Sequence, residues 1–342
     1  MNASTIPLDA LNAEVVAIFR NVGFSAAQAA ALARGIVAGE RDGCKSHGIY
    51  RIAGCLRTLK AGKVVPDAEP VLADTDGAIV RIDAKGGFAN LAFVRGLPEF
   101  VSRTRALGMA ALVVNDCTHF SALWPEIEDI TAHGLAGLAM CPSYATVAPA
   151  GGIRPLLGTN PFAFGWPRRD APPYVFDFAT SVVARGEIEL FRRAGDPLPD
   201  GWAIDADGNP TDDPDAALAG AMLPFGGHKG SAIATMIELL AGAMIGDFTS
   251  DEALDFLGST AIAPRHGELI LAFDPSRFAG GRGDPLARGE RFIAAIADQG
   301  ARLPGQRRHA ARARSLAHGI KLTPAERAEL DRLRRDGLDA VD

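Results

Sequence analysis

The order of helical and strand-like segments constrains the fold of this chain more than any single motif. Apolar residues recur at helical spacing near the start, at Leu11, Val15, Ile18 and Phe19. Strand-like runs dominate the middle, and two or three helices are expected near the end. The regular strand–helix alternation of a doubly wound parallel sheet is missing. We therefore expect an α/β fold with a mixed, largely antiparallel sheet and flanking helices.

Local signals bound the expected elements. Helices are predicted over 46–61, 91–107 and 229–246, and strands over 78–82, 110–115, 135–140, 174–178 and 268–273. Capping boxes are predicted at 25–28 and 323–326, and a long polar loop at 195–214 with a turn at 205–208.

Charge and composition exclude several classes of protein. The 342 residues are 48% hydrophobic and carry a net charge of −6, without a basic block in the first 300, which argues against nucleic acid as a partner. The longest apolar runs fall short of the roughly 18 residues that span a bilayer, so no membrane contact is expected. No basic segment followed by an apolar core opens the chain, so no signal peptide is expected and a cytoplasmic location follows by default.

The cysteine pattern gives no sign of a metal or redox site. Cys44, Cys55, Cys117 and Cys141 include no C-x-x-C pair, so we expect free, mostly packed thiols and no metal.

The G-x-G-x-x-G fingerprint of dinucleotide-binding sheets is also missing. The nearest glycine cluster is GGHKGS at 226–231, directly before the apolar helix predicted from residue 229. Small residues at a helix N-terminus let a phosphate approach backbone N–H groups, and His228 and Lys229 add donors. A tight loop entering a buried helix is the alternative interpretation.

The segment SHGIYR at 46–51 is the first candidate for chemistry. On one helix, His47 and Arg51 would lie four residues apart on the same face. An imidazole exchanges protons near neutral pH, and a guanidinium binds a carboxylate with two parallel hydrogen bonds. The pair suits reduction of a C=N or C=O group beside a carboxylate, although a structural pair would have the same spacing.

Three further segments carry polar residues at the ends of predicted strands. THFSALWP at 118–125 places His119 where open α/β sheets bind ligands, with a capping or packing role as the alternative. LGTNPF at 157–162 predicts tight loops in which Thr159 could orient a carboxylate. DFATS at 177–181 leads to Glu187, a second carboxylate that could orient a catalytic imidazole. The remaining histidines, His133, His266, His309 and His318, are predicted to be structural or surface residues.

Basic residues gather near the C-terminus. The segment 302–308 contains Arg302, Arg307 and Arg308, followed by Arg312 and Arg314. This patch is either a solvated helix start or the binding site of an anionic cofactor.

Together these motifs resemble those of one family. SHG at 46–48, LGTNP at 157–161, FGGHKG at 225–230 and PGQRR at 304–308 are similar to segments of the malate/L-lactate dehydrogenase family of non-Rossmann oxidoreductases. That family includes ureidoglycolate dehydrogenase and diketogulonate reductase. HFSALWP at 119–125 and LPFGGHKG at 223–230 look most like the branch that reduces Δ1-piperideine-2-carboxylate and Δ1-pyrroline-2-carboxylate.

The resemblance implies an NADPH-dependent homodimer that converts small cyclic imino acids to L-pipecolate or L-proline. It also implies a relay of Ser46, His47 and Glu187, in which His47 donates the proton while hydride reaches C2. Thr159 matches a substrate-contacting position, and Arg51 or backbone donors are expected to hold the substrate carboxylate. The cofactor-contacting positions are matched by Arg51, His119, Phe120, Ser121, Ala122, Leu123, Asp177, Phe178, Ala179, Arg185, Gly186, His228, Lys229, Arg302, Arg307 and Arg308. The arginines favour NADPH, since a 2′-phosphate binds guanidinium groups.

Two residues depart from the pattern of the branch. Glu187 replaces an aspartate, and Arg185 replaces a histidine two residues earlier. The alternatives are an NAD(P)-dependent dehydrogenase of malate, lactate, ureidoglycolate or a sugar acid on the same fold, and a non-catalytic metabolite-binding protein.

The expected organisation has three regions. They are an N-terminal helical region at 1–75, a mixed-sheet region at 76–280 that binds cofactor and substrate, and C-terminal helices at 281–342 that pack back on the core.

Overall fold

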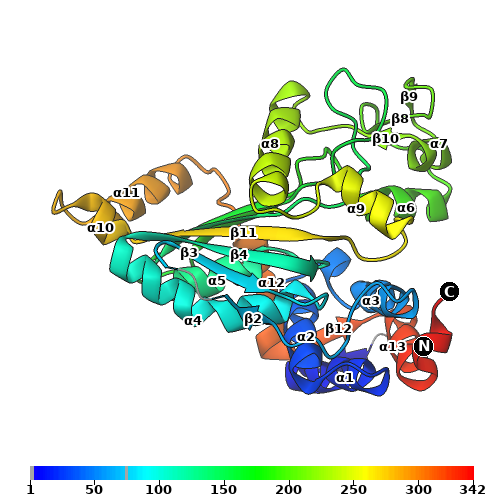
Figure 1. Cartoon of the computed structure of the whole chain (residues 1–342), viewed down its shortest axis with the longest axis horizontal. Helices are drawn as coiled ribbons and strands as arrows, with labels where there is room; N and C mark the ends of the chain where they lie inside the picture. Colours follow the sequence, from blue (N-terminus) through cyan, green and yellow to red (C-terminus); the bar gives the residue numbers. More distant parts are fainter. Residues whose placement is uncertain (1–3, 74–75) are drawn as a thin grey trace.

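A seven-stranded sheet runs through the centre of the computed structural model, which describes residues 4–73 and 76–342 (Figure 1). The strand order is β2-β3-β4-β11-β5-β6-β7. Neighbouring strands are antiparallel except for the parallel pair β3 and β4, so the predicted mixed, largely antiparallel fold class is confirmed. The strands are β2 (Val71–Leu72), β3 (Ile79–Asp83), β4 (Met109–Thr118), β5 (Ala136–Met140), β6 (Phe162–Trp166), β7 (Tyr174–Phe178) and β11 (Arg265–Phe273).

Helices cover both faces of this sheet because its central strands are apolar on both sides. Successive strand residues point to opposite faces. On β4, Leu112 packs in the cluster shared with α4 (Ala89–Leu107) and α5 (Trp124–Ala132), whereas Val113 packs against α8 (His228–Glu238) and the π-helix η2 (Leu239–Ala243).

The two ends of the chain share a helical layer beside the sheet, blue and red in Figure 1. β1 (Ser4–Ile6) pairs antiparallel with β12 (Ile320–Leu322). The apolar stripe of α1, including Leu11, lies in one core cluster with Ile320 and Leu330. The helical elements here are α1 (Leu8–Asn21), α2 (Ala26–Arg41), η1 (Lys45–His47), α3 (Tyr50–Lys60), α12 (Gln306–His318), α13 (Pro324–Asp336) and η3 (Gly337–Ala340).

The remaining elements lie on the other side of the sheet or at its far end (Figure 1). Above the sheet are α6 (Arg185–Ala194), β8 (Ala203–Ile204), β9 (Pro210–Thr211), α7 (Pro214–Ala219), β10 (Ala221–Met222) and α9 (Ser250–Leu257). Two helices, α10 (Pro275–Ala279) and α11 (Pro285–Ala297), extend away from the body of the molecule. Within residues 4–73 and 76–342, no helix has both the length and the apolar character needed to cross a membrane.

Several local predictions need correction. The helix predicted over 46–61 is a 3-10 turn at Lys45–His47 followed by α3, and the chain bends at Gly48 between them. Ser25 caps α2 as predicted, but Gln28 donates to Ala68 O instead of closing a capping box. The apolar helix predicted over 229–246 changes to π geometry at Leu239, and the loop predicted at 195–214 contains the β8–β9 pair.

The capping box at Thr323 and the turn at 205–208 are confirmed. The division into three regions stays a prediction, and its first boundary, at residue 75, lies outside the described residues. The absence of a signal peptide also stays a prediction, and residues 1–3 lie outside the described residues too.

Candidate active site

A buried glutamate in the last turn of α2 fixes the turn that carries His47. Glu40 Oε1 accepts a hydrogen bond from Ile49 N at 2.9 Å, and its other oxygen pairs with Lys45. A Cβ at Gly48 would lie 1.9 Å from Glu40 Oε1, so only glycine fits there without displacing the carboxylate. The turn therefore depends on Gly48, and this bend is why His47 and Arg51 do not share a helix.

The half-buried imidazole of His47 lies between a hydroxyl and an indole. Ser46 Oγ is 3.1 Å from Nδ1, and the Trp124 ring meets the imidazole edge-on at 5.9 Å between centroids. Burial and the positive charge of Arg51 lower the pKa of His47 to about 3. The imidazole of the unliganded protein is therefore neutral, so one ring nitrogen is a donor and the other an acceptor.

Arg51 contacts the backbone of the turn that carries His47, at Ser46, and does not share a helix face with His47. Its Nε donates to Ser46 O at 2.7 Å, and its guanidinium lies 4.0 Å from the centre of the Phe120 ring. Within the described part of the chain, its two Nη atoms form no hydrogen bond. Burial lowers the pKa of Arg51, yet its ordinary pKa is so high that it remains a cation with two free donors for an anion.

The segment after β4 is held mainly by its own protein contacts. Asp177 Oδ2 accepts from the backbone N–H groups of Leu123 (2.9 Å) and Trp124 (3.0 Å), and so caps α5. Ser121 exchanges hydrogen bonds with Asn90, at 2.8 and 3.1 Å. Ala122 and Leu123 are buried. These predicted cofactor-contacting residues shape the surface behind His47, and their polar side chains already have protein partners.

Three loops meet beside this segment through backbone hydrogen bonds. Thr180 N donates to Thr159 O (2.8 Å), and Phe225 N donates to Thr180 O (3.0 Å). The Phe178 ring meets the Phe225 ring edge-on at 5.8 Å, next to Ala179. The structure thus brings Thr159 together with the end of β7 and the glycine loop, as expected for one site.

The glycine loop is shaped to receive an anion. Gly226 and Gly227 have φ of 57° and 60°, and a Cβ on Gly230 would lie 2.2 Å from Phe225 O. His228 and Lys229 open α8, are exposed, and form no side-chain hydrogen bond with any described residue. An exposed loop, a helix N-terminus and two basic side chains together suit a phosphate.

The first turn of α6 lies near the His47 turn. A Cβ on Gly186 would be 4.0 Å from Tyr50 Oη, which places α6 against the start of α3. Glu187 is exposed, and no hydrogen bond or ion pair joins it to His47 among the described residues. Arg185 donates to Leu218 O at 3.3 Å. The relay of Ser46, His47 and Glu187 therefore stays a prediction, of which the Ser46–His47 contact is present here.

The three C-terminal arginines differ in their surroundings. Arg308 pairs with Glu128 at 3.1 Å, donates to Val175 O at 3.0 Å and lies over the Trp124 ring at 5.1 Å. Arg302 and Arg307 are exposed, and neither has an ion-pair partner in the described chain. Arg308 therefore acts first as an internal anchor, whereas the other two are available to an anionic ligand.

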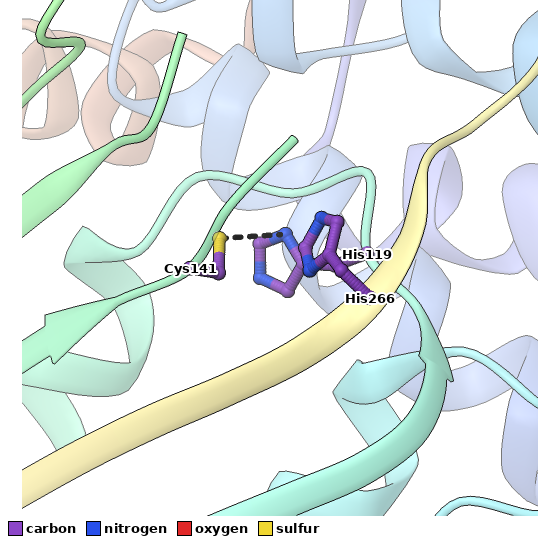
Figure 2. A group of neighbouring side chains, drawn as sticks. All are labelled: His119, Cys141 and His266. Atoms are coloured by element: carbon purple, nitrogen blue, oxygen red, sulfur yellow. Dashed lines mark hydrogen bonds between the residues drawn. The ribbon is translucent and has the colours of Figure 1, made fainter. Parts of the chain in front are cut away.

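Sequence reasoning missed a group of buried titratable residues behind this site, part of which Figure 2 shows. His119 Nε2 lies 3.7 Å from Glu268 Oε1, and its Nδ1 lies 3.9 Å from Cys141 Sγ. The His266 ring is buried and lies 5.8 Å from that of His119, and its assignment as a structural or surface residue stays a prediction. Glu126 completes a second set of close ligand atoms with His119 and Glu268. A charged residue inside the apolar run of β11 was the available signal for Glu268.

Comparisons with known proteins show which family this chain resembles. The family model described as malate/L-lactate dehydrogenase matches residues 6–331. The chain is 68% identical over 342 residues to a Δ1-pyrroline-2-carboxylate reductase of Agrobacterium fabrum, covering 99% of both proteins. It is 55% identical to a Δ1-pyrroline-2-carboxylate/Δ1-piperideine-2-carboxylate reductase of Pseudomonas aeruginosa, covering 94% of this chain and 97% of that protein.

A solved structure shows the same fold. The crystal structure of Δ1-piperideine-2-carboxylate reductase from Pseudomonas syringae superposes with a TM-score of 0.92 at 41% identity, covering 96% of this chain and 99% of the other. The match extends over the sheet and both helical layers, so the likeness is to the whole architecture. The chain therefore belongs to the malate/L-lactate dehydrogenase family of oxidoreductases.

Proposed function

We propose that this enzyme reduces Δ1-pyrroline-2-carboxylate to L-proline and Δ1-piperideine-2-carboxylate to L-pipecolate with NADPH. The observation that carries the proposal is that Ser46 contacts both His47 and Arg51: its hydroxyl lies 3.1 Å from His47 Nδ1, and its carbonyl accepts from Arg51 Nε at 2.7 Å. The Nη atoms of Arg51 stay free of hydrogen bonds to the described residues. A cyclic imino acid carries a basic nitrogen next to a carboxylate, which matches these two groups. The relatives at 68% and 55% identity are named as reductases of these compounds.

Substrate binding follows from the donors that the protein leaves unused. The Nη atoms of Arg51 hold one side of the carboxylate, and the Thr159 hydroxyl approaches from the adjoining loop. Phe120 stacks on the Arg51 guanidinium at 4.0 Å and fixes its plane. A planar guanidinium fixed in this way orients a carboxylate more narrowly than an ammonium group does.

Proton delivery depends on a change in charge around His47. Arg51 and burial hold the pKa of His47 at about 3 in the free protein. A bound carboxylate offsets the positive charge of Arg51 and so raises the pKa of His47 in the complex. His47 then protonates the ring nitrogen, while Ser46 and Glu187 orient its ring and stabilise the imidazolium.

The cofactor site is inferred from the anion-binding features that have no protein partner. The loop at Gly226 and Gly227 with His228 and Lys229 suits a pyrophosphate, and Arg302 and Arg307 suit a 2′-phosphate. Bound NADPH supplies a hydride to C2 of the ring. Arg308, which is tied to Glu128, keeps α12 against the sheet so that the other two arginines face this ligand.

We also propose that the enzyme is a homodimer. α10 and α11 extend from the body of the molecule (Figure 1). Phe278 and Phe292 on these helices are 63% and 70% exposed, and both line a hollow of about 740 Å³. Exposed aromatic residues on a projecting arm are typical of a surface covered by a second copy. Light scattering should give twice the chain mass, and Phe292→Glu should shift it toward the monomer.

A cytoplasmic location is proposed as well. All four cysteines are free, and three of them are buried. Free thiols are typical of a reducing compartment, where NADPH is also kept reduced. A fractionation that finds the protein outside the cytoplasm would overturn this proposal.

The function is tested by product analysis. With purified enzyme and Δ1-pyrroline-2-carboxylate, the amount of NADPH consumed should equal the amount of proline formed, and chiral chromatography should show the L enantiomer. Cofactor consumption with pyruvate but not with the imine would point to a 2-hydroxy-acid dehydrogenase instead.

A further inference from the structure

Two carboxyl groups lie against each other in the protein interior, and neither forms an ion pair with a lysine or arginine of residues 4–73 or 76–342. Glu126 on α5 is 4% exposed and Glu268 on β11 is fully buried. Their ligand atoms lie within 4.8 Å of each other and of a nitrogen of His119. Arg34 and Asp129 act on Glu126, whereas Arg51, His47 and His266 act on His119. Both carboxyl groups also act on the buried thiols of Cys117, which Asp247 and Arg265 face, and of Cys141, which Asp177 faces.

The hydrogen-bond pattern indicates that this pair holds a proton. If both groups were carboxylates, both oxygens of Glu268 and Oε2 of Glu126 would have no hydrogen-bond donor among the described residues. Nε2 of His119 has no hydrogen-bond partner there either. Buried polar groups are nearly always satisfied. A proton on Glu126 lets it donate to Glu268, and a second proton on Glu268 can reach His119 Nε2, which lies 3.7 Å away.

The direction of the pKa shifts agrees with this geometry. Burial and the neighbouring Glu268 raise the pKa of Glu126 well above its usual range. Burial raises the pKa of Glu268 to about 7. Burial and the neighbouring His266, Arg51 and His47 lower the pKa of His119 to about 3.

We propose that Glu126, Glu268 and His119 form a proton-sharing group that returns a proton to the active site during each reduction, a role that rests on the proposed function. The internal step breaks the O–H bond of Glu268 and forms an N–H bond at His119 Nε2. The group stays neutral overall, because a carboxylate and an imidazolium replace a carboxylic acid and an imidazole. The imidazolium then gives up its Nδ1 proton on the side where Cys141 Sγ lies 3.9 Å away. After product leaves, the Nε2 proton returns to Glu268 and Nδ1 takes up a proton that comes from solvent, so the group regains its starting state.

His119 is placed to connect the two regions. It begins the segment that carries Phe120, on which Arg51 stacks, and the charges of Arg51 and His47 both act on its imidazole. Glu126 and Glu268 are positioning residues in this scheme, since they act on the reaction through His119.

Infrared spectroscopy of the wild-type enzyme tests the protonation itself, whichever substrate is reduced. With ¹³C-labelled glutamate, the enzyme at neutral pH should show an isotope-shifted carboxylic acid band that is lost or halved in Glu268→Gln. Absence of any protonated glutamate at pH 6 in the wild-type spectrum would overturn the proposal, and this measurement needs no variant to fold.

Kinetics test the role in turnover. Glu268→Gln should lower kcat about 10-fold to 100-fold, leave the KM for NADPH within about 2-fold, and remove a pKa near 7 from the kcat profile. Glu69→Gln, an exposed control, should keep the wild-type profile. An unchanged profile in a folded Glu268→Gln would overturn the proposal, and so would a stoichiometric bound metal ion that this variant loses. If the proposed function itself is wrong, the result is different: the wild-type enzyme does not turn over cyclic imines at all.

Discussion

Ser46 Oγ lies 3.1 Å from Nδ1 of His47, so a neighbouring hydroxyl is the polar partner of the proposed proton donor. The backbone of the same serine accepts from Arg51 at 2.7 Å. One residue thereby fixes both the donor and the carboxylate anchor. The bend at Gly48 makes this possible, because it brings Arg51 back toward the turn instead of placing it one helical turn away.

Replacement of His47 by alanine should lower kcat by about 10²–10⁴-fold, the usual contribution of a general acid. The KM for NADPH should change little, because the phosphate-binding features lie on other elements. His318→Ala, in an exposed part of α12, is the matched control. Near-normal turnover in His47→Ala would remove His47 from the mechanism.

Glu187→Gln should lower kcat without changing the thermal midpoint, since this exposed side chain has no structural partner among the described residues. We expect a loss of about 10-fold or more if Glu187 stabilises the imidazolium of His47. Glu189→Gln lies on the same helix, where it pairs with Arg192 and Arg193, and should keep full activity. Equal behaviour of the two variants would show that Glu187 has no part in the relay.

Arg307→Ala should reduce the preference for NADPH over NADH, because the exposed guanidinium is expected to bind the 2′-phosphate. The measurement is the ratio of kcat/KM for the two cofactors, which we expect to fall about 10-fold or more. Arg314→Ala, on the same helix and exposed, is the control. A preference for NADH in the wild type would contradict the assignment.

Glu238 supports the loop that carries Thr159. Its carboxylate accepts from Asn160 Nδ2 at 2.8 Å and from Ser250 N at 2.9 Å, and Asn160 adopts a φ of 36°. In Glu238→Gln, the side-chain NH2 group would face the N–H donors of Asn160 or Ser250, and one hydrogen bond would be lost. This loss should lower the free energy of unfolding by about 1–3 kcal/mol. It should also raise the KM for the imino acid, measured by steady-state kinetics, more than the KM for NADPH. Equal increases in both KM values would mean that the loop does not act on the substrate.

The stability conferred by a neutral His47 should depend on pH. Its pKa is about 3 in the folded protein against an ordinary 6.5, so the unfolded chain takes up a proton first as the pH falls. Stability is therefore fully present above about pH 6.5 and is lost as the pH falls toward 3. Between pH 6.5 and 5 the free energy of unfolding should drop by up to about 2 kcal/mol more in the wild type than in His47→Asn. Urea titrations at both pH values check this, and parallel losses in the two proteins would contradict it.

Much of the fold could be predicted because its elements follow simple periodicities. The apolar stripe of α1 and the continuous apolar run of β11 are local patterns, and both elements form where they were expected. The glycine loop at 226–230 was also visible, since it breaks an otherwise apolar segment.

The site was harder to predict because long-range pairing creates it. The His119–Glu268 contact exists only because β11 inserts between β4 and β5, which no local pattern reveals. Arg308 matched a cofactor position in sequence, but its partner Glu128 lies 180 residues away. The break at Gly48 depends on Glu40, whose buried carboxylate occupies the space of a side chain.

The most direct test of the account compares kcat/KM for Δ1-pyrroline-2-carboxylate and Δ1-piperideine-2-carboxylate with that for pyruvate and oxaloacetate, all with NADPH. The placement of Arg51 beside His47 predicts that at least one cyclic imine exceeds both 2-oxo acids by about 100-fold or more. A higher kcat/KM for either 2-oxo acid than for both imines would contradict it.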